Sequence, residues 1–261
     1  MKIIVCIKQV PDTTEVKLDP KTGRLIRDGV PSIINPDDKN ALEEALRIKD
    51  ENPETTVTVV SMGPPQADVA MREALAMGAD EAILISGREF GGSDTWATSY
   101  IIATAIKKIP DYDIIFCGRQ AIDGDTAQVG PQIAEQLNIP QITYVQKLDI
   151  EGDKVIVQRQ LEDGYTVVEA KMPVLLTAIK ELNTPRYMTP KGIFEAYNKT
   201  VQVWGFNDVP VDAEKIGLKG SPTNVNRTFS PEAKGKGIML EGADKETVKT
   251  LIAKLDEKHL L

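Results

Sequence analysis

The stretch IIFCGRQAIDGDTAQVG at residues 114–130 decides the fold. Its apolar start, residues 114–117, predicts a buried strand, and the apolar spacing of Val129, Ile133, Ala134 and Leu137 predicts a helix after it. Between the two lies a glycine-punctuated loop, in which Asp125 and Thr126 are good helix N-cap residues. The stretch is therefore a turn that leaves a strand and opens a helix.

Such a loop suits a phosphate, because unpaired backbone N–H groups and the positive end of the helix dipole point outward from it. Gly118, Gly124 and Gly130 would let the backbone come close to a bulky ligand. The loop is also longer than the roughly 2–6 residues of a plain connector. Its glycine spacing matches neither the dinucleotide fingerprint nor the P-loop, so a capped connection between strand and helix stays open beside nucleotide binding.

Strands and helices alternate over residues 1 to about 140. Apolar runs predict strands at 2–7, 56–60, 82–85 and 113–117, and helices at 66–77, at 95–109 and after Asn35-Pro36. This alternation predicts an α/β fold with a doubly wound, mostly parallel and Rossmann-like sheet. Ligands of such sheets lie at the carboxyl ends of the strands. We therefore expect one pocket there, formed by Cys6, Ser61-Met62-Gly63, Ser86-Gly87, the Gly118 loop and the helix start after Asn35-Pro36.

The pattern then becomes β-rich. A hairpin is predicted from 142–150 and 154–161, with a third run at 165–170 and a buried strand at 173–179 that returns to the sheet; a shorter hairpin is predicted from 16–18 and 24–26. We place the α/β domain at 1–206 and a C-terminal arm at 207–261, which either lies on a partner subunit or is a loose linker. The arm ends in a predicted helix at 244–258 with an apolar face of Val248, Leu251, Ile252 and Leu255.

Composition narrows the possible functions. The net charge is −8 and no basic run occurs, which disfavours nucleic acid as a partner. No apolar run approaches the roughly 18–20 residues of a membrane span. Cys6 and Cys117 are expected to be buried free thiols, which fits a cytoplasmic location. His259 is the one histidine, so the chain offers no catalytic residue and no metal site, and any hard chemistry falls to a cofactor.

Together these pieces resemble the beta subunit of electron transfer flavoprotein. The matching residues keep their order over nearly the whole chain: residues 5–12, Asn35-Pro36, 43–47, 61–64, 74–80, 118–130, 159–173, and Asn183 with Pro185-Arg186-Tyr187. The resemblance implies a heterodimer with an alpha subunit that holds an electron-transferring FAD. The beta subunit of this family holds a second adenine nucleotide, which is a structural AMP in housekeeping members and a second FAD in electron-bifurcating members.

The loop resembles the bifurcating branch. The AMP type carries three successive acidic residues followed by Cys-Asn-Gln-Thr-Gly, whereas here the run is Asp123-Gly124-Asp125-Thr126-Ala127-Gln128-Val129-Gly130. Gly124 removes a carboxylate where a longer ligand must pass, and the repulsion removed is on the order of 1 kcal/mol. Asp37-Asp38 departs from the AMP type as well. In that branch FAD accepts hydride from NADH; one electron passes to the alpha flavin and an acyl-CoA dehydrogenase-type enzyme, the other to ferredoxin or flavodoxin.

The resemblance also implies roles for particular residues. Cys6 contributes backbone contacts to adenine or ribose, Met62 and Gly63 lie beside the adenine, and Asn35 and Asp38 bind the adenosine or cap a helix. Arg119 neutralises a phosphate, lies by the flavin or forms a surface ion pair. The residues expected to wrap ribose and phosphates are Asp123, Gly124, Asp125, Thr126, Ala127, Gln128 and Val129. Residues 189–194 occupy the place of the family's dehydrogenase-recognition loop, but the anchoring Leu aligns near Pro190, so Ile193 or Phe194 is the expected anchor.

Two other functions stay open at this point: a non-bifurcating beta subunit with a structural AMP, and a non-redox ATP- or AMP-binding module. The block from Arg159 to Tyr187 and the arm argue against the module, which should be soluble alone. In either redox function the chain is an electron-carrier subunit. Whether it also counts as part of an NADH-oxidising enzyme depends on the choice between them.

Overall fold

The computed structural model describes residues 1–12, 31–226, 235 and 237–261, which form two compact units, Met1–Val225 and Asn226–Leu261. The hairpin predicted at 16–26 lies outside the described residues. The first unit reaches beyond the boundary predicted after residue 206, because Val209 and Ile216 are buried in its core.

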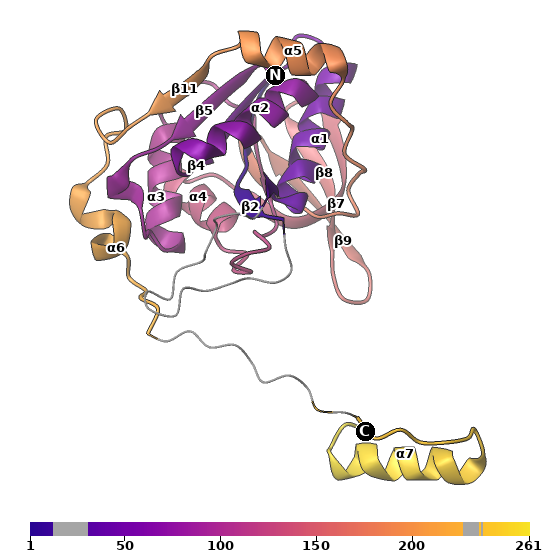
Figure 1. The fold of residues 1–261 in the computed structure, drawn as a ribbon. Helices are drawn as coiled ribbons and strands as arrows, with labels where there is room; N and C mark the ends of the chain where they lie inside the picture. The colour runs from indigo at the N-terminus through magenta and orange to yellow at the C-terminus, as the bar shows by residue number, and fades with distance from the viewer. Residues whose placement is uncertain (13–30, 227–234, 236) are drawn as a thin grey trace. The chain divides into compact units, whose positions relative to one another are not determined.

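The first unit is built on a sheet whose described strands follow the order β11-β5-β4-β1-β6-β10-β7-β8-β9 (Figure 1). All neighbours from β11 to β7 run parallel, and β7, β8 and β9 form an antiparallel extension. The strands are β1 Lys2–Cys6, β4 Thr56–Met62, β5 Glu81–Ile85, β6 Ile114–Gly118, β7 Gln141–Glu151, β8 Lys154–Gln160, β9 Tyr165–Lys171, β10 Val174–Ala178 and β11 Val201–Trp204. A separate antiparallel pair joins β2, Gln9–Pro11, to β3, Ser32–Ile34. The predicted mostly parallel sheet and its β-hairpin addition are confirmed.

Helices cover both faces of the sheet. The helix α1, Pro36–Glu51, and α2, Asp68–Met77, pack on one face, while α3, Thr95–Ile106, and α4, Val129–Leu137, pack on the other. The shorter helices are α5 Pro190–Asn198 and α6 Gly217–Gly220, and 3₁₀ turns span Pro65–Ala67, Arg88–Phe90 and Ala213–Lys215.

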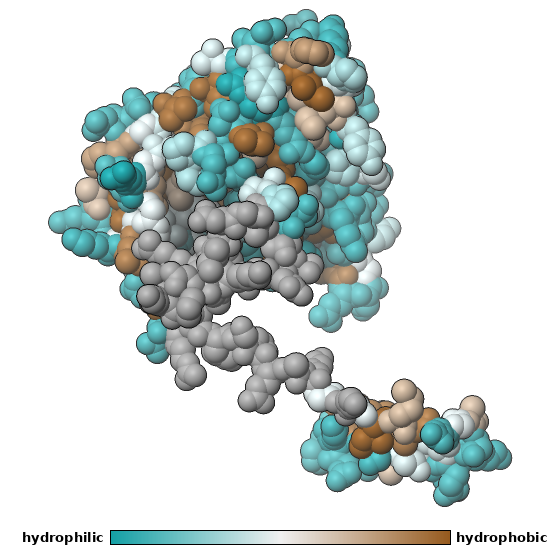
Figure 2. Space-filling view, viewed as in Figure 1, coloured by the Kyte–Doolittle hydropathy of each residue, from teal (hydrophilic) through white to brown (hydrophobic). Residues whose placement is uncertain are grey.

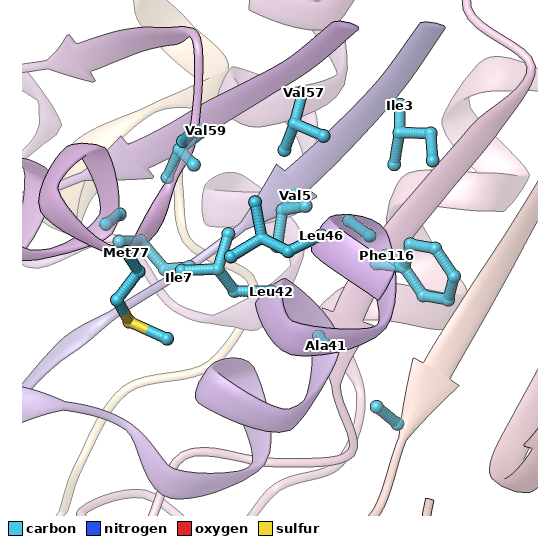
Figure 3. Packing of buried hydrophobic residues seen from close by; sticks show 14 of the residues in the cluster. Ile3, Val5, Ile7, Ala41, Leu42, Leu46, Val57, Val59, Met77 and Phe116 are labelled. Atoms are coloured by element: carbon cyan, nitrogen blue, oxygen red, sulfur yellow. The ribbon is translucent and has the colours of Figure 1, made fainter. Parts of the chain in front are cut away.

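The alternation of side chains along β1 divides the core between the two faces. Ile3 and Val5 point toward α1, whose Leu42 and Leu46 lie against the sheet (Figure 3), whereas Ile4 belongs to the core under α3 and α4. These side chains are at most 2 % exposed, so the sheet is anchored on both sides by fully dehydrated contacts.

Two local predictions were wrong. The helix predicted from residue 66 begins only at Asp68, after the 3₁₀ turn Pro65–Ala67, and Val69 in its first turn is 63 % exposed. The helix expected to reach residue 109 ends at Ile106.

The second unit contains α7, Lys245–Glu257, as predicted. The Asp244 carboxylate caps it by accepting the N–H of Thr247. Val248, Leu251 and Ile252 are each about half exposed, and Figure 2 shows apolar side chains gathered on this helix. The unit itself therefore leaves the predicted apolar face open to a partner.

A buried polar network joins α1 to the segment that precedes α5. Glu43, which is 5 % exposed, accepts two hydrogen bonds from the Arg186 guanidinium, at 2.8 and 3.0 Å, and one from its backbone N–H at 3.0 Å. Asn183 donates to Glu44 at 2.9 Å and exchanges further hydrogen bonds with Asn40. Since residues 183–189 form neither helix nor strand, this network fixes their path.

We expect Arg186→Gln to lower the free energy of unfolding by about 3 kcal/mol, because it leaves the buried Glu43 carboxylate without its charge partner. Urea unfolding of the purified protein measures this. Lys191→Gln is the matched control: its ion pair with Glu195 is largely exposed, so it should change stability by under about 0.5 kcal/mol. Equal effects of the two variants would show that the buried network does not stabilise the fold.

Candidate functional site

A cavity of about 1110 Å³ opens at the carboxyl ends of β1, β4, β5 and β6. The segments predicted to converge there do so, except that Ser61 is buried in β4: Cys6, Met62-Gly63, Ser86-Gly87 and the Gly118 loop all line the cavity, together with Asp38 from the first turn of α1. The geometric prediction is confirmed, and nucleotide binding by these residues stays a prediction.

Most of the expected site residues line this cavity, and three do not. Those that line it are Cys6, Asp38, Met62, Gly63, Arg119, Gly124, Thr126, Ala127, Gln128 and Val129. Asn35, Asp123 and Asp125 lie outside its wall. Their side chains bind other parts of the protein, so any role they have is to shape the loop.

The loop before α4 has an unusual backbone. Asp125 and Ala127 have φ values of 47° and 52°, a left-handed conformation that residues other than glycine adopt rarely. The N-cap of α4 is Gln128, not Asp125 or Thr126 as predicted, and the Asp125 carboxylate instead accepts the Gln120 amide at 2.8 Å. The left-handed bend at Asp125 and Ala127 therefore places the start of α4 later in the sequence than predicted.

This bend leaves backbone donors available. Among the described residues, the N–H groups of Thr126, Ala127 and Gln128 donate to no backbone or side-chain acceptor. Successive N–H groups around left-handed residues form concave anion sites, and here they lie in the cavity wall just ahead of a helix N-terminus. The arrangement suits a phosphate.

The three loop glycines serve different purposes. A Cβ on Gly118 would lie 2.6 Å from the backbone nitrogen of Asp38, and one on Gly130 would lie 2.9 Å from the Thr177 methyl group. These two positions therefore need glycine because of the protein's own chain, and close approach of a ligand to them stays a prediction. Only Gly124 faces open space, with nothing within 4 Å of a built Cβ.

Asp38 ties the site together. Its carboxylate accepts the Lys8 N–H at 2.7 Å and the Gly118 N–H at 2.9 Å, so it joins the ends of β1 and β6. Burial raises the pKa of Asp38 to about 7, against the opposing effect of these N–H groups and of the Asn35 amide. Each carboxylate oxygen accepts one of the protein's own N–H groups, and adenosine binding by Asp38, which lines the cavity, stays a prediction.

Asn35 holds the loop from the other side. Its Nδ2 donates to the Gln120 carbonyl at 2.8 Å, and its Oδ1 accepts the Ile122 N–H at 3.0 Å. Asn35 is the N-cap residue of α1, yet its side chain makes no capping hydrogen bond, so it shapes the loop and does not satisfy the helix.

Two cations of the cavity wall are paired with carboxylates. Arg119 Nε lies 3.2 Å from Asp37 Oδ2, although the pair lacks hydrogen-bond geometry, and Lys8 Nζ lies 2.6 Å from Asp123 Oδ1. Of the alternatives open for Arg119, the structure shows the ion pair. Burial raises the pKa of Asp37, and the Arg119 charge opposes that shift.

The two cysteines are buried free thiols, as predicted. They occupy matching positions on β1 and β6, and contact with Cys6 together with burial raises the pKa of Cys117 well above its usual value. Burial and the neighbouring thiol thus disfavour the thiolate of Cys117, which is the reactive form of cysteine.

Of the cavity wall that follows β5, sequence reasoning predicted only Ser86-Gly87. Residues 85–88 and 90–95 line the cavity there, as do Lys8 and Gln9 after β1. The Gly91-Gly92-Ser93-Asp94 turn lies in this wall, and Asp94 also caps α3 by accepting the Ala97 N–H at 2.9 Å. Two glycines after a strand were the available signal for a second function.

Within the described ranges, no cluster of three or more His, Cys, Asp or Glu side chains could hold a metal ion. None of the helices in this part of the chain has the length and apolar character needed to cross a membrane.

Comparison with known proteins gives a consistent result. Residues 22–209 match the model of the electron transfer flavoprotein domain. The chain is 62 % identical over 262 residues to the electron transfer flavoprotein subunit beta of Thermoanaerobacterium thermosaccharolyticum and 58 % identical over 262 residues to subunit CarD of the caffeyl-CoA reductase-Etf complex of Acetobacterium woodii. It is also 53 % identical over 269 residues to the acryloyl-CoA reductase electron transfer subunit gamma of Anaerotignum propionicum. Each match covers 100 % of both chains.

The glycine geometry predicts opposite outcomes for two alanine variants of one loop. Gly118→Ala should cost about 3 kcal/mol of unfolding free energy, because the new methyl group must displace the backbone at the start of α1. Gly124→Ala should leave stability unchanged or raise it by up to about 1 kcal/mol, since its site is open. Chemical unfolding of both variants measures the difference, and a loss of more than about 2 kcal/mol in Gly124→Ala would contradict the described loop.

Proposed function

The chain belongs to the electron transfer flavoprotein family as a beta subunit, and from this premise we propose that its cavity binds FAD and serves electron bifurcation. In this function, bound FAD would supply the redox chemistry, which is acceptance of a hydride from NADH followed by separate transfer of the two electrons. One passes to the FAD of an alpha subunit and then to an acyl-CoA dehydrogenase-type enzyme, and the other passes to ferredoxin or flavodoxin. The chain acts as an electron-carrier subunit of a heterodimer.

The residues present fit a dinucleotide. The uncommitted N–H groups of Thr126, Ala127 and Gln128 would bind its phosphates, and Met62 and Gly63 would flank the adenine. The single observation that carries FAD over AMP is the extent of the cavity, which runs from the β6 loop past β1 and β4 to the turn after β5 and measures about 1110 Å³. Typical small-ligand pockets hold roughly 300–1,000 Å³, so an AMP would leave much of it unfilled.

Gly124 supports the same choice. It lines the cavity and leaves open space where an acidic residue stands in the AMP-type loop, so neither a side chain nor a carboxylate obstructs a longer ligand. The names of two relatives, subunits of caffeyl-CoA and acryloyl-CoA reductase systems, favour a partner that reduces acyl-CoA compounds. The alternative with a structural AMP remains within the same family, whereas a non-redox module has no support from the family match.

The nucleotide content of the complex tests this proposal. The chain should be coexpressed with its alpha subunit, purified without oxygen, and denatured so that the released FAD and AMP can be counted by chromatography. We expect two FAD per heterodimer and reduction of flavin by NADH. One FAD with one AMP, persisting after incubation with excess FAD, would overturn the proposal in favour of the structural-AMP alternative.

The surface around α5 is the proposed docking site for the acyl-CoA dehydrogenase-type partner. The network between α1 and Arg186 fixes the chain just before Tyr187, which is 94 % exposed, and Phe194 on α5 is 77 % exposed. Figure 2 shows apolar side chains gathered at the end of the molecule where α5 lies. Ile193, the other expected anchor, is only 40 % exposed, so Phe194 presents more of its side chain to a partner.

We expect Phe194→Ala to raise the KM for the dehydrogenase partner about tenfold, because an exposed aromatic anchor typically contributes more than about 1 kcal/mol to an interface. Flavin content and reduction by NADH should not change. Steady-state electron transfer to the partner measures the effect. Val69→Ala, an apolar side chain of similar exposure on α2, is the control, and equal KM values for the two variants would exclude Phe194 as the anchor.

A further inference from the structure

The helix α5, which carries the proposed docking surface, is weakly anchored by its own apolar side chains. Of its described residues only Ala196 is buried, while Phe194 and Tyr197 are 77 % and 73 % exposed. A helix of nine residues is also too short to be stable alone, because isolated helices below about 12–15 residues are marginal in water. Contacts with the rest of the protein therefore determine where α5 lies and how it presents Phe194.

Such contacts come from α2, which lies against α5 (Figure 1). Near the amino end of α5, a Cβ on Gly192 would overlap the carbonyl oxygen of Ala76, so the first turn of α5 lies directly on the last turn of α2. This close approach of two backbones fixes one end of α5. The orientation of the helix about that end depends on what holds its carboxyl end.

Arg72, in the middle of α2, holds the carboxyl end of α5. Its Nη1 donates to the carbonyl oxygens of Ala196 and Lys199, at 2.7 and 2.6 Å. Ala196 lies in the last turn of α5 and Lys199 is its C-cap residue, where helical carbonyls lack partners and partial negative charge accumulates. A guanidinium suits this place because it combines a positive charge with several N–H donors in one plane.

The Arg72 side chain is itself held in position. Its Nε lies 3.3 Å from Asp68 Oδ2, one turn earlier on α2, and its guanidinium carbon lies 5.6 Å from the centre of the Tyr197 ring. The side chain is 22 % exposed, so these contacts are partly shielded from water. A guanidinium fixed on α2 and bonded to the end of α5 makes the orientation of α5 depend on α2.

We propose that Arg72 is a positioning residue for electron transfer: it holds α5 in the orientation that presents Phe194, and so sets the affinity for the acyl-CoA dehydrogenase-type partner. This inference rests on the docking surface of the proposed function. Arg72 does not line the nucleotide cavity, so its effect on the partner passes through α5. Without its two hydrogen bonds α5 would adopt other orientations, and partner binding would weaken in proportion to the molecules that leave the competent one.

The test compares Arg72→Met and Arg72→Lys in the intact heterodimer. Met keeps an unbranched apolar stem but removes the charge and every donor. We expect Arg72→Met to raise the KM for the partner about fivefold, as it would if the competent orientation fell to about one fifth of the molecules. The kcat, flavin content and reduction by NADH should not change. Arg72→Lys should fall between, because its ammonium keeps the charge at the helix end without the fork.

A double-variant cycle separates positioning from general loss of stability. If Arg72 acts by presenting Phe194, Arg72→Met should raise KM far less in the Phe194→Ala background than in the wild type, because coupled residues are not additive. Amide hydrogen exchange over residues 193–199 should also become faster in Arg72→Met. Lys49→Gln is the matched control, since Lys49 is a partly buried cation that donates to the Gly78 carbonyl at the end of α2, at 3.0 Å, and should leave KM unchanged.

The outcomes distinguish this inference from the proposed docking surface. An unchanged KM in Arg72→Met beside a raised KM in Phe194→Ala would overturn the inference and leave the docking surface in place. Independent effects in the double variant, or loss of flavin from Arg72→Met, would also overturn it, because Arg72 would then act by another route. Unchanged KM values in both single variants would refute the docking surface and the inference together.

Discussion

The carboxylate of Asp38 is the interaction on which the rest of the site depends. It lies in the first turn of α1 and accepts backbone N–H groups at the ends of β1 and β6, at 2.7 and 2.9 Å. Such contact requires the bare backbone of Gly118, because any Cβ there would overlap the Asp38 main chain. The cost is a buried carboxylate whose pKa rises to about 7. Since its folded-state pKa exceeds the ordinary value near 3.9, protonation favours the folded state, and this contribution declines as the pH rises toward and through 7.

The same helix connects the site with the proposed docking surface. The first turn of α1 holds the nucleotide loop through Asn35 and Asp38, and its middle holds the segment before α5 through Glu43 and Glu44. Burial raises the pKa of Glu44, and its contacts with Asn183 and Arg47 oppose that shift. A charged carboxylate at this depth is therefore unfavourable unless it has such partners. Polar groups at that depth specify one arrangement, because each demands its own partner. One helix thereby connects the proposed cofactor site with the proposed docking surface.

The sequence patterns correctly predicted those features of the fold that depend on the periodicity of apolar residues. The parallel sheet, the antiparallel addition and the convergence of strand ends followed from apolar runs and their order, which local physics imposes. The predictions were wrong where contacts between residues distant in the sequence determine the local structure. The roles of Gly118 and Gly130 are set by α1 and Thr177, which no local pattern reveals, and the left-handed Asp125 and Ala127 moved the helix cap to Gln128. The first unit ends later than predicted for the same reason, because Val209 and Ile216 are buried against residues that lie far from them in the sequence.

In this loop, the contacts that fix the backbone are separate from the N–H groups that face the cavity. Asn35, Asp38 and the Gln120–Asp125 hydrogen bond hold its backbone, and none of these contacts involves the side chains of residues 126–128. The donors offered to a phosphate are main-chain N–H groups, which every residue type except proline supplies. Substitutions at 124 and 126–128 can therefore alter the room and charge around a nucleotide while the phosphate-binding geometry persists. Under the proposed function, such a loop could hold one adenine nucleotide or another without a change of fold, and Gly124, with nothing within 4 Å of a built Cβ, leaves the room that the longer one would need.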